Sequence, residues 1–214
     1  LGWALEAAGG APLDRLCRER VFGPLSLGAT AFVDEVALAR GEGRPGVRAG
    51  LEFAATSRSP HRGEVSCGSV DDENAWALGG VAGHAGLFST ARDVAALGQA
   101  WLEALAGKSP LVGRETARLF AAPSGPGGRG LAWDRPSAEG SALGSRLGRG
   151  PRGAVGHLGF TGTSFWLDLE LGQMVVLLTN RVHLGRDDKT KIQAFRPRFH
   201  EAASRILRFT RAYR

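Results

Sequence analysis

Hydrophobic and polar positions follow a helical spacing at the start of the chain. Residues 1–8 are largely apolar and end at Gly9-Gly10, and Pro12 then opens a stretch with apolar side chains at positions 13, 16, 17 and 21. Intervals of three and four residues place these side chains on one helix face, and Gly23-Pro24 stops the pattern. Two short helices are therefore predicted. Between residues 28 and 74 the periodicity fades into Gly, Pro, Arg and Ser, which predicts a long surface loop.

A stronger helical pattern begins after a glycine-rich stretch. Thr90 and Asp93 have the spacing of a capping box, in which the hydroxyl caps the helix and the carboxylate reaches back. The predicted buried stripe consists of Val94, Leu97, Trp101 and Leu105. Gly107 ends this helix, and residues 113–120 predict another short one.

Strand patterns dominate the later part of the chain. Residues 128–134 are strand-like, and stronger strands are predicted for 154–158, 163–169 and 173–180, the last two joined by the turn Glu170-Leu171-Gly172. Residues 191–212 predict a closing helix with apolar positions 192, 195, 199, 203, 206 and 207. The expected class is α+β, an antiparallel sheet flanked by helices. We expect one domain, with a mainly helical and loop part at 1–127 and the strands and last helix at 128–214.

Composition narrows the classes of function. A chain of 214 residues is long enough to bury a core, and its excess of 27 Lys and Arg over 21 Asp and Glu comes entirely from residues 183–214. That basic segment is either the solvated face of the last helix or a tail for an anionic partner, and the neutral remainder argues against a nucleic-acid partner. The sequence has neither an apolar run of membrane-spanning length nor a leader signature, and it indicates no compartment or oligomeric state.

Metal and nucleotide sites are not predicted. Cys17 and Cys67 are far apart in sequence and are expected to be buried apolar thiols. No cluster of His, Cys and carboxylates has the spacing of metal ligands. The glycines at 79, 80, 83 and 86 follow no strand and lack the Lys-Ser or Lys-Thr of a phosphate loop. We therefore expect no metal and no cofactor.

Histidines are the remaining candidates for chemistry. By spacing alone His157 is an ordinary half-buried strand histidine, and His61, His183 and His200 have no partner at a useful spacing. In the segment DDENA, Asp72 and Asn74 are predicted to be turn residues that make local backbone bonds.

Three segments in order resemble a known family. ALEAAGGAPLDRLCRERVFGPLSL, ALGGVAGHAGLFSTARDVA, and GHLGFTGTSFWLD with VVLLTNR are similar to segments of the penicillin-recognising serine hydrolases, the group of class C β-lactamases, DD-peptidases and esterases. The resemblance implies a β-lactamase/transpeptidase-like fold. It also implies hydrolysis of an ester, amide or β-lactam through an acyl-enzyme.

The resemblance assigns roles to a few positions. The family's third active-site motif, Lys-Thr-Gly or His-x-Gly, corresponds to His157-Leu158-Gly159. His157 would then project a polar donor into the cleft, Gly159 would let substrate approach the strand, and the N–H of Phe160 would be one oxyanion-hole donor. His84 would either orient a loop over the cleft or cap backbone groups.

Two family motifs are missing from this sequence. Its three lysines are Lys108, Lys189 and Lys191, and none stands three residues after a serine, so no Ser-x-x-Lys nucleophile motif exists. The only tyrosine, Tyr213, is not in a Tyr-x-Asn type triplet, whereas in relatives that triplet stands directly before a segment like the LGW with which this chain starts.

We therefore expect a C-terminal fragment of a serine hydrolase, without catalytic residues of its own, without the nucleophile helix and first strands, and inactive alone. In the intact protein the partner would be a small-molecule or peptide-like substrate. Family members are often extracytoplasmic. The histidine in place of the motif's lysine favours ester or small amide chemistry over antibiotic hydrolysis. The alternative is a non-catalytic binding module with a basic C-terminal tail.

Overall fold

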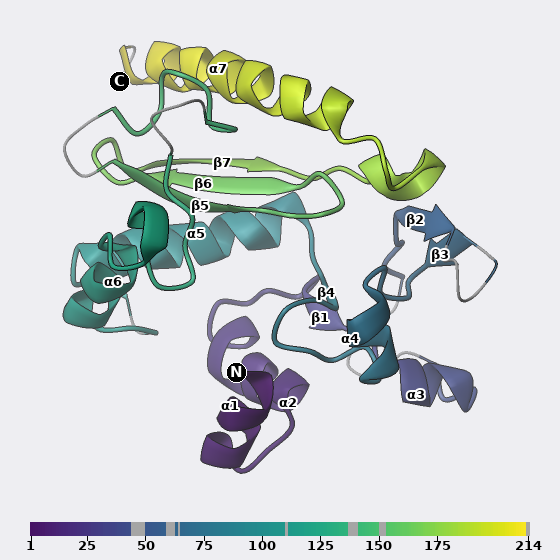
Figure 1. The fold of residues 1–214 in the computed structure, drawn as a ribbon. Coiled ribbons are helices and arrows are strands. Elements are labelled where there is room, and N and C mark those ends of the chain that lie inside the picture. The colour runs from purple at the N-terminus through teal and green to yellow at the C-terminus, as the bar shows by residue number, and fades with distance from the viewer. Residues whose placement is uncertain are drawn as a thin grey trace. The chain divides into compact units, whose positions relative to one another are not determined.

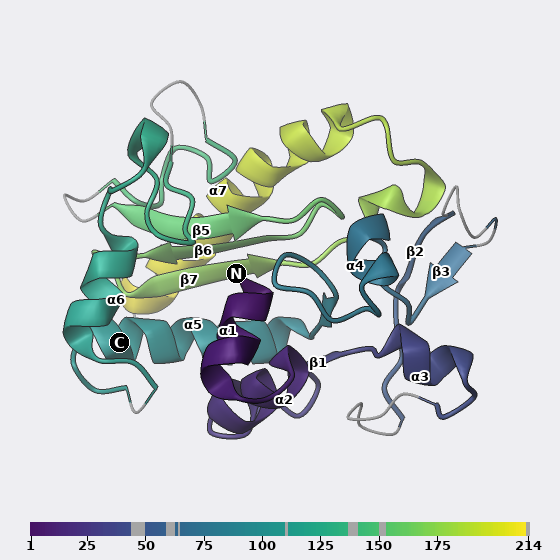
Figure 2. The same cartoon turned by 60° about the horizontal axis from the view of Figure 1, so that its bottom comes forward.

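A computed structural model describes residues 1–43, 50–58, 63, 65–109, 111–136, 141–149 and 153–212 (Figures 1 and 2). The chain folds into two compact units, each with most of its contacts within itself. The first unit is Leu1–Ala96 with Asn180–Arg186, and the second is Leu97–Thr179 with Asp187–Arg214. These units describe packing, and the division of one domain into parts at 1–127 and 128–214 stays a prediction about its organisation.

The first unit begins with the two predicted helices. Helix α1 (Gly2–Gly9) ends where Gly10 adopts a left-handed conformation with φ +67°, a backbone that glycine adopts without strain. The Glu6 carboxylate then accepts the N–H of Leu13 at 2.9 Å and satisfies one free donor at the start of α2 (Leu13–Cys17). The helix continues as a π-helical turn, η1 (Arg18–Phe22).

The predicted loop between residues 28 and 74 is wrong, because the segment holds several short elements. Strand β1 (Ala31–Phe32) pairs antiparallel with β4 (Leu87–Phe88), and β2 (Ala55–Arg58) with β3 (Val65–Cys67). The unit also contains two short helices, α3 (Glu35–Ala39) and α4 (Glu73–Ala77). Elements of two to five residues are shorter than the window over which hydrophobic periodicity is detected.

A late segment of the chain belongs to this first unit. It contains the turn η3 (Arg181–Leu184). Asn180 donates from Nδ2 to the carbonyl of Ala55 at 2.7 Å, and Arg186 binds the carboxylates of Glu73 and, at 3.6 Å, Asp71.

In the second unit, three strands form an antiparallel sheet in the order β5-β6-β7, as predicted. They are β5 (Ala154–Leu158), β6 (Ser164–Asp168) and β7 (Gln173–Leu177). The β6–β7 turn closes through the N–H of Gly172, which donates to the carbonyl of Asp168 at 3.0 Å. The strand expected at 128–134 is wrong: the turn η2 (Pro126–Gly128) precedes it, and only Asp134 forms a bridge, to Gly156.

Helices cover both faces of this sheet (Figure 1). On one face, Val155 and Leu167 pack with side chains of α5 (Ala91–Leu105) and α6 (Arg114–Ala121). On the other, Ala154 and Trp166 pack with side chains of α7 (Thr190–Ala212). Because neighbouring strand residues point to opposite faces, one strand contributes to both cores, and the α+β class is confirmed.

The structure corrects two details of the predicted helices, one at the start of α5 and one along α7. At α5 the Thr90 hydroxyl accepts the N–H of Asp93 at 3.3 Å, as predicted, but the Asp93 carboxylate binds the N–H of Ala29 and the hydroxyl of Thr30, both at 2.8 Å. A contact 63 residues away has replaced the reach back to the cap. On α7, Phe195 and Ile206 are exposed, because polar side chains occupy part of the face toward the sheet.

Candidate functional site

Strand β5 presents His157 at the edge of the sheet. The imidazole is exposed, and the residue pairs with Phe165 on β6. Period-two alternation puts His157 on the same sheet face as Val155, the face that α7 does not cover. On the outer edge of β5, the backbone N–H of Gly156 donates a hydrogen bond to the carbonyl of Asp134 at 3.0 Å. His157 is thus an exposed side chain of an edge strand, and the half-buried interpretation from spacing alone is wrong.

The turn after β5 contains the other two predicted residues. The N–H of Gly159 donates to the carbonyl of Thr163 at 2.8 Å, and the N–H of Gly162 donates to the carbonyl of Gly159 at 3.1 Å. A Cβ on Gly159 would lie 2.0 Å from Thr163 Oγ1, so any larger residue there would force the Thr163 side chain to move. Close approach of substrate at Gly159 stays a prediction. Phe160 is half-exposed, with Lys189 Nζ 5.5 Å from its ring centroid.

His84 lies in the first unit, on the loop after α4. Its Nε2 is 3.1 Å from Oδ1 of Asp72, the residue that caps α4 by accepting the N–H of Ala75 at 2.8 Å. The local role predicted for Asp72 is confirmed. His84 contacts this capping carboxylate, and its role at a cleft stays a prediction because His157 belongs to the other unit.

Sequence reasoning missed a row of buried polar residues on α7. Arg196, His200 and Ser204 are 7%, 0% and 1% exposed, and their spacing of four residues puts them on one helix face. Arg196 had been counted with the basic tail, and His200 had no visible partner. The sequence did contain a signal, because positions 196, 200 and 204 have the same spacing as the adjacent apolar row at 199, 203 and 207. It was passed over because charged residues are almost never fully buried unless they are paired.

His200 is held in its neutral form. Its Nε2 is 2.8 Å from the hydroxyl oxygen of Ser164, and Nδ1 has no hydrogen-bond partner in the part of the chain that the structure describes. A protonated ring would need an acceptor for both N–H groups. Burial, and next the positive charge of Arg196, lower the pKa of His200 to about 4.

Arg196 binds the turn that follows β5. Its Nη2 donates to the carbonyls of Gly159 at 2.8 Å and Thr163 at 2.9 Å, and its Nε donates to Gly162 at 3.1 Å. The guanidinium thereby connects the closing helix to the turn that holds Phe160.

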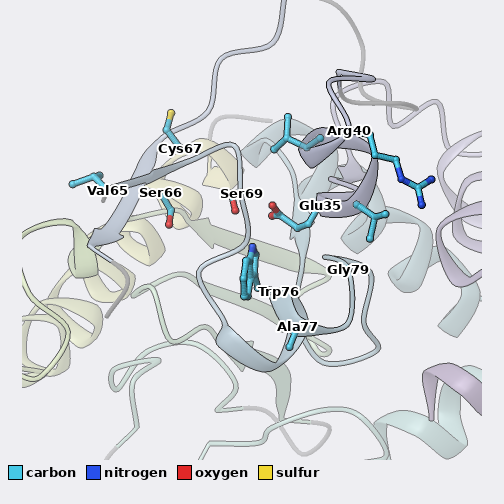
Figure 3. A pocket seen from close by; sticks show the side chains of 11 residues that line it. Glu35, Arg40, Val65, Ser66, Cys67, Ser69, Trp76, Ala77 and Gly79 are labelled. Carbon is cyan, nitrogen blue, oxygen red and sulfur yellow. The ribbon is translucent and has the colours of Figure 1, made fainter. Parts of the chain in front are cut away.

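A pocket of about 670 Å³ lies within the first unit, between α3, β3 and α4 (Figure 3). Its lining includes Glu35, Arg40, Ser66, Cys67 and Trp76. None of His157, Gly159 and Phe160 lines it. The Glu35 carboxylate accepts the N–H of Val70 at 2.8 Å, so it already supports the fold.

The cysteines differ from expectation. Cys67 is exposed and Cys17 is partly exposed, so neither is the fully buried thiol that was predicted. Burial, with a smaller contribution from Asp14, raises the pKa of Cys17, which lowers its reactive thiolate fraction.

The described ranges contain no group of three or more His, Cys, Asp or Glu that could hold a metal ion. They likewise contain no helix that is both long and apolar enough to cross a membrane.

Comparison with known proteins identifies the family. The family model described as Beta-lactamase matches residues 1–196. This chain belongs to the β-lactamase family. It is 31% identical over 195 residues to a putative D-alanyl-D-alanine carboxypeptidase of Escherichia coli O157:H7, covering 86% of this chain and 43% of that protein. It is 33% identical over 198 residues to an N-acetylmuramyl-L-alanine amidase of Bacillus subtilis, covering 86% and 42%. The chain spans less than half the length of these relatives.

Solved structures agree on the fold of this β-lactamase-family chain. A β-lactamase from Mycobacterium bovis superposes with a TM-score of 0.59 at 17% identity, covering 94% of this chain and 59% of that one. Simvastatin synthase (LovD) from Aspergillus terreus superposes with a TM-score of 0.62 at 15% identity, covering 95% and 52%. The β-lactamase/transpeptidase-like fold is confirmed.

Proposed function

We propose that this chain forms the substrate-facing wall of a serine hydrolase that cleaves an ester, amide or β-lactam through an acyl-enzyme. The observation that carries the proposal is the exposed His157 on edge strand β5, followed at once by the turn that holds Phe160. Curated relatives named carboxypeptidase and amidase support a substrate with an amide bond.

Each residue has a distinct role in this proposal. The imidazole of His157 donates to a substrate carboxylate or joins the proton network of the nucleophile. The backbone N–H of Phe160 stabilises the oxyanion, and a donor of this kind contributes about 10²–10³ in rate. The sequence has no Ser-x-x-Lys, so the nucleophile would come from residues that precede Leu1 in a longer protein.

Active-site labelling tests whether the chain needs such a partner segment. A fluorophosphonate probe and a fluorescent penicillin are applied to the 214-residue chain and to the protein translated from the reading frame extended upstream. We expect label only on the extended protein, at a serine of a Ser-x-x-Lys motif. Label on the 214-residue chain would refute its inactivity, and an upstream frame with neither motif nor label would refute the hydrolase proposal.

The role of His157 is tested by restoring the lysine of the family motif. In the extended protein, His157→Lys replaces a titratable donor with a permanent charge, so kcat/KM for a carboxylate-bearing ester should rise about tenfold relative to its methyl ester. Ala202→Lys, at an exposed position of α7, adds the same charge as a control. An unchanged preference in His157→Lys, or an equal change in the control, would remove the assigned role.

The binding-module alternative has less support. Of the nine basic side chains in residues 183–214, Arg186 pairs with Glu73 and Asp71, and Arg196 is buried on the sheet. Those two charges are used within the fold. Sedimentation with anionic phosphatidylserine vesicles, absent with neutral vesicles, is the result that would favour the alternative.

A further inference from the structure

Arg196 binds the turn after β5 in a way that determines the direction of one peptide group. Two of the carbonyls it binds, those of Gly159 and Thr163, also accept the backbone N–H groups that close the turn. A third, that of Gly162, accepts from Nε. The neighbouring carbonyl of Thr161 accepts the hydroxyl of Thr179 at 2.9 Å. The turn is thus held through its carbonyl groups from outside as well as by its own hydrogen bonds.

The carbonyl of Gly159 and the N–H of Phe160 belong to the same peptide group. No cis peptide bond occurs in the described residues, and in a planar trans peptide the C=O and N–H point in opposite directions. Because Arg196 Nη2 is 2.8 Å from the Gly159 oxygen, the N–H of Phe160 points away from the guanidinium. His157, on the preceding strand, lies on the sheet face that α7 does not cover.

The charge on Arg196 also changes the strength of that donor. A hydrogen bond from an ionised donor polarises the carbonyl it reaches, and polarisation passes through the peptide group to make its N–H a stronger donor. Cooperative strengthening of this kind is about 10–30% per bond, and water competes little for the guanidinium because Arg196 is only 7% exposed. Buried arginine is costly unless its donors are satisfied, and these three carbonyls satisfy donors on both Nη2 and Nε.

We infer that Arg196 is a positioning residue: it aims and polarises the N–H of Phe160 and so sets the oxyanion-stabilising power of the β5–β6 turn. This inference rests on the proposed function, because the value of that N–H to catalysis depends on an acyl-enzyme reaction at this site. The orientation of the peptide group is a property of the 214-residue chain and is measured separately.

The first measurement uses amide NMR of the 214-residue chain. Arg196→Met removes the donors, and Arg205→Met, at an exposed position about two and a half turns farther along α7, is the matched control. We expect hydrogen exchange at the amides of Gly159 and Gly162 to accelerate about tenfold or more in Arg196→Met, with a shifted Phe160 amide signal. Arg196→Lys keeps a charge but loses the fork, so it should lie between parent and Met, and it carries the test if Arg196→Met does not fold by circular dichroism.

The second measurement uses the extended protein and a p-nitrophenyl ester. A positioning role predicts that kcat falls at least about tenfold in Arg196→Met with KM changed less than about twofold, and that Arg196→Lys recovers part of the loss. Arg205→Met should match the parent. Unchanged turn amides, or loosened amides with unchanged kcat, would overturn the inference. A parent protein that neither takes label nor cleaves the ester would refute the proposed function, and the amide data alone would then decide whether Arg196 orients the peptide.

Discussion

Lowering the pH should destabilise the fold through His200, and the structure gives the size of the effect. The pKa of this buried imidazole is lowered from 6.5 to about 4, so between these values the unfolded chain binds a proton that the folded chain does not. The stabilising contribution of this group is therefore nearly complete above pH 6.5 and falls by about 1.4 kcal/mol for each pH unit between 6.5 and 4. From pH 7.5 to 4.5 the loss from this group is about 2–3 kcal/mol.

His200→Gln isolates this contribution. The glutamine amide can still bond Ser164 but does not titrate, so its free energy of unfolding should lose about 2–3 kcal/mol less than the parent over the same pH range. Urea denaturation followed by tryptophan fluorescence measures both profiles. Hydrogen bonds from Ser145 lower the pKa of Glu201, and the stability that this carboxylate loses at acid pH is common to both proteins and cancels in their difference.

Exposed His183 on η3 provides the control: His183→Gln should keep the steep profile of the parent. Parallel profiles for the parent and His200→Gln would show that the imidazole is not held neutral by the fold, and the reasoning would be wrong.

Two further substitutions test the packing of each unit by urea denaturation. Gly156→Ala should destabilise the second unit by at least about 2 kcal/mol, because the added Cβ would lie 2.2 Å from the carbonyl oxygen of Phe165. The control Gly113→Ala, with nothing within 4 Å of the added atom, should cost less than about 1 kcal/mol. Equal costs for the two substitutions would contradict the prediction. Arg186→Met removes the guanidinium that binds Glu73 and the buried Asp71 and should destabilise the first unit by about 2 kcal/mol. An effect no larger than that of Arg198→Met, at an exposed position, would show that these ion pairs contribute nothing.

Local sequence patterns correctly predicted the helices and strands that are long enough for their hydrophobic period to be recognised. The strands at 154–158, 163–169 and 173–180 agree with β5, β6 and β7 to within three residues at either end. The helix expected at 113–120 is α6. Motif spacing also led to the correct family, because His157-Leu158-Gly159 and the hairpin after it are contiguous in sequence.

Local sequence patterns did not predict the shortest strands or the contacts between residues far apart in sequence. The paired strands β1 to β4 have two to four residues each, which is too few for a period to be counted. Asp93 has the spacing of a capping box, yet its carboxylate binds Thr30. A local pattern cannot reveal a competing partner 63 residues away in sequence.

The sequence by itself determined the hairpin, the helix that precedes it, the family and His157 as a candidate, because each of these is encoded in residues close together along the chain; that His157 is exposed was decided by the structure. Tertiary structure alone decided that Arg196 and His200 are buried, and that they meet Gly159 and Ser164, 37 and 36 residues away. In sequence an arginine on a closing helix resembles any solvated charge. When the helix packs on the sheet, the guanidinium of Arg196 loses its water, and its N–H donors are satisfied instead by the carbonyls of the turn.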